Sequence, residues 1–212
     1  EIPLRLVGSE MCIRDRILIA VILVIGAIKI LNVAPRGYAA GCETFSWLLT
    51  PATVCLAVPL YEQVKVLKKN LPAIFVGVLA GTAVSLGCVA ILCRVFAMED
   101  RMLASLLPKS ITTAMGIAIS EQLGGVPAVT TAVIIITGIL GNICGSSLCR
   151  LLKIQEPIAQ GVAFGTASHV VGTSRASEIS ELTGAVSSLS LVVAGILTAI
   201  ACPFLCLSLI HI

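Results

Sequence analysis

Stretches of nearly uninterrupted apolar sequence recur along this chain of 212 residues. A helix needs about 20 apolar residues to cross the hydrocarbon core of a bilayer, and several of these stretches approach that length. Hydrophobic residues make up 58% of the chain and charged residues 12%, whereas a soluble domain carries roughly 25% charged residues. The pattern predicts an all-α polytopic membrane protein that lies in the lipid bilayer as a single domain.

Four apolar segments are predicted to span the bilayer, namely residues 17–31, 71–95, 126–152 and 184–205. The segment 71–95 contains Gly77 and Gly81, a GxxxG pattern that predicts a face for close helix packing. The loop before it, residues 62–70, holds three lysines, and basic loops of membrane proteins lie in the cytoplasm.

The two ends of the chain do not fit this pattern. Residues 1–16 are charged, have no periodicity and resemble translated sequencing-adaptor sequence. We predict that they are a non-native flank and that residues 207–212 are a non-native tail. The membrane domain is then 17–206, truncated at its N-terminus.

Two further apolar segments are interrupted. Residues 45–61 contain two prolines, and residues 103–121 contain Pro108 followed by Lys109. Interrupted apolar segments are typical of the discontinuous helices of transporters, although 45–61 also fits a merely kinked span. If Arg150 and Lys153 are cytoplasmic, 103–121 must enter and leave on one side, which predicts a re-entrant segment.

The most polar central stretch is 161–181, GVAFGTASHVVGTSRASEISE. Unpaired backbone groups cost several kcal/mol each in hydrocarbon, so irregular backbone at membrane depth must line a cavity or be buried in protein. This stretch is the strongest site candidate, and the alternative is an ordinary loop between two spans.

Two passages of the chain resemble one another. SEQLG at 120–124 precedes an apolar run containing GIL at 138–140, and SELTG at 180–184 precedes another with GIL at 195–197. Internal repeats of a broken segment plus a span are common in secondary transporters. Similar residues at two unrelated helix ends would produce the same similarity, so an internal repeat and shared helix-end chemistry both stay open.

Charge and motifs exclude several functions. A net charge of +3 is too small to indicate nucleic-acid binding. Most of the nine cysteines lie in apolar spans and none forms a CxxC, so we expect no metal and no cofactor. The chain has neither a GxSxG elbow nor an HExxH pair, and we predict that it is not an enzyme.

The polar residues of the interrupted segments suit a small carboxylate, which needs cations and donors to enter a bilayer. Lys109 and Arg175 supply the cations, and helix ends near 112–113 and 166–168 would add backbone N–H groups. The predicted substrate-binding residues are Lys109, Ser110, Thr112, Thr113, Thr166, Ser168, His169, Thr173 and Arg175. His169, Glu121 and Glu181 are candidates for proton coupling.

Each of these residues also has a structural explanation. Lys109 would snorkel to the interface from a helix start, and His169 would only hold a turn through a backbone carbonyl. Arg175 would be a cytoplasmic interface residue. Glu178 and Glu181 would begin the helix of the last span, near its positive end.

Four blocks together carry a family resemblance: LLTPATVCLAVPLYEQ, LLPKSITTAMGIAISEQLGG, ITGILGN and GTASHVVGTSRASEISELTGAVSSLSLVVAGILT. They resemble the LrgB/CidB family, which is related to a domain of the plastidial glycolate/glycerate translocator. The resemblance covers about 17–205. The family normally starts with at least one more hydrophobic segment, which agrees with a truncated N-terminus.

The resemblance implies a multi-pass protein of the bacterial inner membrane with one of two functions. The first is a carrier of small monocarboxylates such as pyruvate, glycolate or glycerate, acting with a small holin-like LrgA-type partner. The second is an antiholin-like regulator of murein hydrolase activity and autolysis, without transport. Homo-oligomerisation stays open in both.

Overall fold

The computed structural model describes residues 23–31, 37, 41 and 61–210. The chain divides into two units, Glu1–Cys55 and Leu56–Ile212, and each is described by itself. In the first unit residues 23–30 are helical, which is the described part of the span predicted at 17–31. The flank 1–16, residues 45–60 of the Pro-interrupted segment and residues 211–212 lie outside the described residues.

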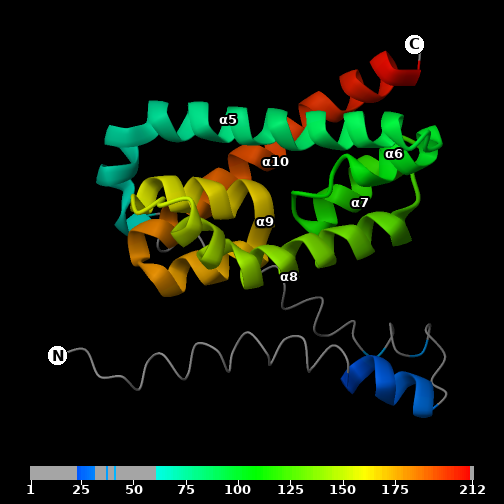
Figure 1. Cartoon of the computed structure of the whole chain (residues 1–212), viewed down its shortest axis with the longest axis horizontal. Helices are drawn as coiled ribbons and strands as arrows, with labels where there is room; N and C mark the ends of the chain where they lie inside the picture. Colours follow the sequence, from blue (N-terminus) through cyan, green and yellow to red (C-terminus); the bar gives the residue numbers. More distant parts are fainter. Residues whose placement is uncertain (1–22, 32–36, 38–40, 42–60, 211–212) are drawn as a thin grey trace. The chain divides into compact units, whose positions relative to one another are not determined.

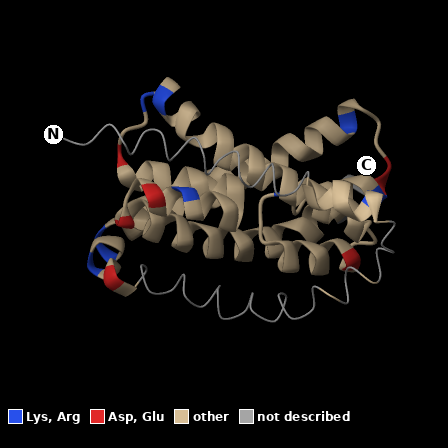
Figure 2. Ribbon diagram, turned by 90° about the horizontal axis from the view of Figure 1, so that it is seen from below, with Lys and Arg blue, Asp and Glu red and all other residues tan. Residues whose placement is uncertain are grey.

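Three long apolar helices form the frame of the second unit (Figure 1). They are α5 (Val64–Val95), α8 (Pro127–Leu151) and α10 (Glu181–Ile210), and each is long and apolar enough to cross a membrane. Figure 2 shows their charged residues at the ends and their central turns without charge. The described residues contain no strand, and the prediction of an all-α membrane protein is confirmed.

The helix α5 begins earlier than the sequence indicated. The lysine-rich segment 62–70, which was predicted to be a loop, is almost entirely helical and leads directly into the span. Lysine, leucine and glutamine are good helix formers, so charge alone does not end a helix. Pro72 lies inside α5, where the missing N–H allows a change of direction between the basic first turns and the apolar remainder.

The first broken segment consists of α6 (Asp100–Leu106), a non-helical stretch at 107–112 and α7 (Thr113–Gln122). After α7 the chain returns to α6, because the N–H of Val126 donates to Ser105 Oγ at 2.7 Å. The hydroxyl of Thr130 then fixes the start of α8 to Ser120 Oγ at 2.7 Å. The segment therefore enters and leaves at one end, as the re-entrant prediction requires.

The second broken segment is α9 (Pro157–Ile179), which is interrupted at His169 with φ 43° and ψ −140°. A Cβ on Gly172 would lie 2.9 Å from the carbonyl oxygen of Phe164. In a straight helix these residues would be about 12 Å apart along the axis, so α9 folds back on itself. The stretch predicted to be irregular is thus helical on both sides of one break, which keeps its backbone groups paired.

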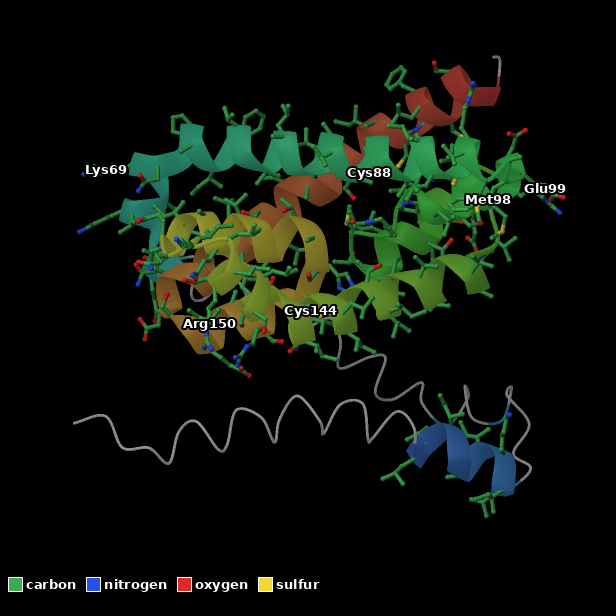
Figure 3. The ribbon with its side chains drawn as sticks, in the orientation of Figure 1. Lys69, Cys88, Met98, Glu99, Cys144 and Arg150 are labelled. Carbon is green, nitrogen blue, oxygen red and sulfur yellow. The ribbon has the colours of Figure 1, made fainter. Side chains whose placement is uncertain are left out.

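The two hairpins enter from opposite ends (Figure 1). Figure 3 places Lys69 and Arg150 at one end of the helices, and Met98 and Glu99 at the other. The α6–α7 hairpin starts at the Glu99 end, whereas the α9 hairpin starts at the Arg150 end. Lys69 of α5 and Arg150 of α8 lie at the same end, as the charge argument for a re-entrant segment assumed, whereas Arg94 lies at the other end of α5.

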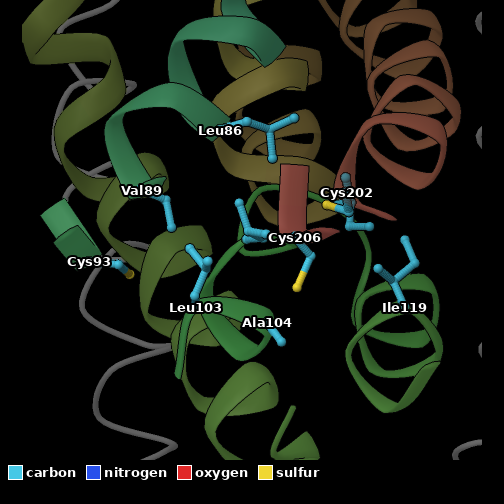
Figure 4. Packing of buried hydrophobic residues seen from close by; sticks show 10 residues of the cluster. Leu86, Val89, Cys93, Leu103, Ala104, Ile119, Cys202 and Cys206 are labelled. Atoms are coloured by element: carbon cyan, nitrogen blue, oxygen red, sulfur yellow. The ribbon is translucent and has the colours of Figure 1, made fainter. Parts of the chain in front are cut away.

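The hairpins are packed in different ways. Figure 4 shows the α6–α7 hairpin against apolar side chains of α5 and α10, among them Leu86, Val89, Cys202 and Cys206. The α9 hairpin instead lies against glycines of α8, since a Cβ on Gly145 would collide with the ring of Phe164. Small residues let membrane helices approach closely, and α9 uses this throughout.

The order of elements agrees with an internal repeat, the first of the two explanations for the similarity between residues 120–140 and 180–197. A broken hairpin followed by a span occurs twice, as α6–α7 with α8 and as α9 with α10, and the two copies run in opposite directions (Figure 1). Ser120 lies in the last turn of α7 and Ser180 directly follows α9, so both come shortly before the next span. Ser180 Oγ accepts a bond from the N–H of Thr183 at 3.0 Å, which helps to begin α10. This arrangement is that of inverted repeats.

Candidate functional site

One face of α5 brings the two hairpins together. Gly77, Gly81 and Ser85 follow at intervals of four residues and so lie on the same face. A Cβ on Gly77 or Gly81 would lie 3.2 Å from Val162 or Thr166 of α9, respectively. The third position, Ser85 Oγ, is 2.9 Å from Ser110 Oγ. The tips of the two hairpins therefore meet within about one turn of α5, near its midpoint.

A narrow pocket lies at this meeting point. It is lined by residues of both hairpins and both flanking spans, namely Thr82, Ser85, Leu86, Leu107, Ser110, Ile111, Thr166, Ala194 and Thr198. The space measures about 210 Å³ when its open part is included, but its closed part is too narrow for a water molecule. Hydroxyl groups are prominent in the lining, and leucine and isoleucine close it.

Lys109 places a cation beside the pocket. Its Nζ donates to Ser110 Oγ at 3.1 Å and to Ser85 Oγ at 3.3 Å. Both hydroxyls line the pocket, so the lysine does not point back to the end where its hairpin starts. This geometry favours the predicted binding role of Lys109 and Ser110 over a lysine that snorkels to an interface.

Thr112 and Thr113 mark the beginning of α7. Thr112 is the N-cap residue with extended φ and ψ, and its side chain makes no capping hydrogen bond. The positive end of this ten-residue helix consequently lies at the hairpin tip, two positions after the Ser110 of the pocket. The predicted helix end at 112–113 is observed.

His169 forms the break in α9. A positive φ is costly for a residue with a side chain, and this one is held by contacts on both sides. The ring Nε2 lies 2.9 Å from the carbonyl oxygen of Ile134 on α8, and the backbone carbonyl of His169 accepts a bond from Thr173 Oγ1 at 2.9 Å. The ring is buried beside Gly138 of α8, and it fits there because Gly138 has no side chain. The break also lets a new helix begin here, with its positive end at the hairpin tip.

Ser168 and Thr173 are buried on either side of the break. Ser168 fills the space over Gly141 of α8, where a Cβ would have no room. Thr173 Oγ1 is 2.9 Å from Ser187 Oγ of α10. Thr166 lines the pocket, although its hydroxyl donates to the carbonyl of Val162 at 2.7 Å. Of these three predicted residues, only Thr166 reaches the pocket.

Arg175 lies in the returning arm of the α9 hairpin, away from the tip. Its guanidinium donates from Nε to Ser146 Oγ of α8 at 3.2 Å and from Nη1 to Glu178 Oε2. The structure does not bring Arg175 to Lys109. Its contacts fasten the arm to α8, which agrees better with a structural role.

Glu121 and Glu181 are both exposed at the bases of the hairpins. Glu121 lies in the last turn of α7, and Glu181 lies in the first turn of α10, where a carboxylate favours the positive helix end. Neither lines the pocket. Of the three proton-coupling candidates, only His169 is buried at a hairpin tip.

Sequence reasoning missed three hydroxyl residues of the pocket: Thr82, Ser85 and Thr198. All three lie in spans that read as plainly apolar. A signal was present, because Ser85 continues the face of Gly77 and Gly81, and Thr82 is one turn before it. That face was predicted to be a packing surface, but its continuation into the site was not recognised.

This is a helical membrane protein in which two opposed broken segments meet at a polar pocket near the centre of its spans. The chain belongs to the LrgB-like family, whose model matches residues 9–207. It is a membrane protein of the holin-like LrgB/CidB type.

Curated relatives cover almost the same length. The uncharacterized protein YwbG of Bacillus subtilis (strain 168) is 36% identical over 189 residues, which are 89% of this chain and 84% of that protein. Holin-like protein CidB of Staphylococcus epidermidis is 37% identical, and that of Staphylococcus aureus (strain Mu50 / ATCC 700699) is 35% identical. Each of these matches covers 90% of this chain and 83% of the relative. No solved structure matches the chain.

Proposed function

We propose that this protein is a carrier of small monocarboxylates, such as pyruvate, glycolate or glycerate, in the bacterial inner membrane. The observation that carries the proposal is the meeting of two opposed hairpin tips at a hydroxyl-lined pocket beside Lys109. Substrate sites of secondary transporters lie near the bilayer midplane, where discontinuous helices of inverted repeats meet. A small holin-like LrgA-type protein is the partner we expect.

The chemistry of the pocket suits an anion of this size. The lysine ammonium supplies charge, and Ser85 and Ser110 supply hydroxyl donors next to it. The beginning of α7 adds a positive helix end at the same tip. Because the pocket is narrow, a bound substrate requires the hairpins to separate, which fits alternating access better than a static pore.

The test is uptake of labelled pyruvate and glycolate into vesicles that contain the chain, with and without an LrgA-type protein. We expect saturable uptake that falls roughly ten- to hundredfold in Lys109→Ala, the effect of losing one charge-assisted contact. Lys68→Ala is the matched control, since Lys68 is exposed in the first turns of α5. An inward proton gradient in the same vesicles tests whether His169, buried at the break, serves in proton coupling.

The alternative function is antiholin-like regulation of murein hydrolase activity and autolysis. It is favoured by the name "holin-like protein" that the CidB relatives carry. Leakage that is not saturable and is equal in the wild type and Lys109→Ala would support a pore. No uptake at all, together with altered autolysis, would support regulation without transport.

A further inference from the structure

One hydroxyl of the pocket is fully buried and has no hydrogen-bond partner among the described residues. Thr82 on α5 lines the pocket and is 6% exposed, and its Oγ1 bonds to none of the described residues. Buried polar groups in folded proteins are almost always paired, so an unpaired one requires an explanation.

Three threonines of α8 and α9 behave differently. Thr131, Thr166 and Thr173 each donate to the carbonyl four residues earlier, at 2.8, 2.7 and 2.9 Å. This bond is the usual one for a threonine inside a helix. The Thr82 hydroxyl does not make it and remains available to something in the pocket.

The neighbours of Thr82 indicate what that ligand is. Ser85 follows three residues later on the same helix, about 4.5 Å further along the axis. Ser85 is in turn bonded to Ser110 and Lys109. The pocket thus holds a cationic end that suits a carboxylate and, one helical turn away, the buried neutral hydroxyl of Thr82.

We propose that Thr82 determines specificity by binding the oxygen on C2 of a 2-oxo or 2-hydroxy monocarboxylate whose carboxylate lies at Lys109. This inference rests on the proposed carrier function. A 2-oxo group accepts a hydrogen bond from the Thr82 hydroxyl, and a 2-hydroxy group accepts or donates one. Acetate and propionate lack that oxygen and leave the buried hydroxyl unpaired, so the site discriminates against them.

The experiment compares uptake of pyruvate with that of propionate, which has nearly the same size, in vesicles containing the full chain. Thr82→Val keeps the shape and removes the hydroxyl, whereas Thr82→Ser keeps the hydroxyl. We expect Thr82→Val to lower the pyruvate-to-propionate ratio of kcat/KM about five- to tenfold, the effect of one neutral hydrogen bond. Thr82→Ser retains the ratio, and so does Thr131→Val, whose lost hydroxyl bonds only within α8.

A second measurement is independent of transport. Thermal unfolding of Thr82→Val without substrate is expected at or above the wild-type temperature, because the substitution removes a buried unpaired hydroxyl. Thr131→Val, which loses a bonded hydroxyl, is expected to unfold at a lower temperature. A clear loss of stability in Thr82→Val would overturn the inference, because the hydroxyl would then have a partner in the protein.

The outcomes separate the two proposals. Saturable, Lys109-dependent uptake with an unchanged ratio in Thr82→Val overturns the role of Thr82 and leaves the carrier function standing. Uptake that is absent, or indifferent to Lys109→Ala, overturns the carrier function and the role of Thr82 with it. If Thr82→Val does not accumulate in the membrane, Thr82→Ala takes its place with the same expected ratio.

Discussion

The two broken hairpins have the same topology but differ in how their breaks are made. The α6–α7 hairpin opens into the non-helical stretch 107–112, which carries Lys109 and packs against leucines and cysteines. The α9 hairpin breaks at His169 alone and packs against glycines on α8 and α10. One tip presents charge to the pocket, whereas the other is a tightly fitted turn. The α6–α7 hairpin therefore supplies the charged group of the pocket, and the α9 hairpin supplies a rigid wall beside it.

The largest loss of stability is expected for a substitution in the closely packed α9 hairpin. A Cβ on Gly165 would lie 2.4 Å from the carbonyl oxygen of Ser187 and 2.8 Å from the Cβ of Ser190. Backbone of α10 cannot yield as a flexible side chain can, so Gly165→Ala should destabilise the protein by about 3 kcal/mol. Thermal or denaturant unfolding in detergent measures this.

The matched control is Gly87→Ala on α5, where an added Cβ would meet nothing within 4 Å. Alanine is the better helix former by about 0.5–1 kcal/mol, so this variant should be as stable as the wild type or more so. Equal losses in the two variants would mean that the α9 hairpin is not packed more tightly than an open helix face.

The next largest difference in stability is expected for substitutions at the helix break, His169. Glycine inside a helix is normally less stable than alanine by roughly 0.5–1 kcal/mol, but at a positive φ the order reverses. Both His169→Gly and His169→Ala lose the ring bond to Ile134, so their difference isolates the backbone. We expect His169→Gly to be more stable than His169→Ala by about 1 kcal/mol in the same unfolding measurement.

Ala167 offers the comparison within the same hairpin, because it is exposed and helical. Ala167→Gly should lower the stability by about 0.5–1 kcal/mol, because alanine is the more stabilising residue at an ordinary helical position. If glycine is worse than alanine at 169 as well, the strained turn does not exist in solution.

The smallest effect is expected for the ion pair in the arm of α9. The Glu178 side chain is 42% exposed and pairs with Arg175 three residues earlier, whose side chain is 8% exposed. The carboxylate is partly in water and the amide oxygen of glutamine can still accept a bond from the guanidinium, so Glu178→Gln should cost about 0.5 kcal/mol and leave pyruvate uptake within about twofold. A loss of uptake comparable to that of Lys109→Ala would place this arm in the substrate path and remove the distinction between tip and arm.

Much of the fold followed from the amino-acid pattern. The spans at 126–152 and 184–205 agree closely with α8 and α10, and the proline–lysine interruption predicted the break at 107–112. The stretch 161–181 was correctly singled out as buried and interrupted, but its helical character was not anticipated. Glycine, serine and threonine are poor helix formers in water, yet without competing water a membrane helix keeps these backbone groups paired.

The candidate site was predicted only in part. Lys109, Ser110 and Thr166 lie at the pocket or directly beside it, whereas Arg175 and the two exposed glutamates do not. Residue type indicated which side chains can bind a carboxylate, but not which arm of a hairpin carries them. Thr82 and Ser85 were missed because two hydroxyls in an apolar span resemble ordinary packing residues.

The class of protein, its spans, its broken segments and its family could all be read from the amino-acid order, because hydrophobic length, prolines and the combination of polar blocks are local properties. Helix packing was needed to bring the hairpins together on one face of α5, to gather the side chains of the pocket and to leave the Thr82 hydroxyl without a partner among the described residues. These depend on the direction in which each hairpin enters and on close glycine contacts between helices distant in sequence. No local pattern specifies such contacts, because they arise only when the helices pack together.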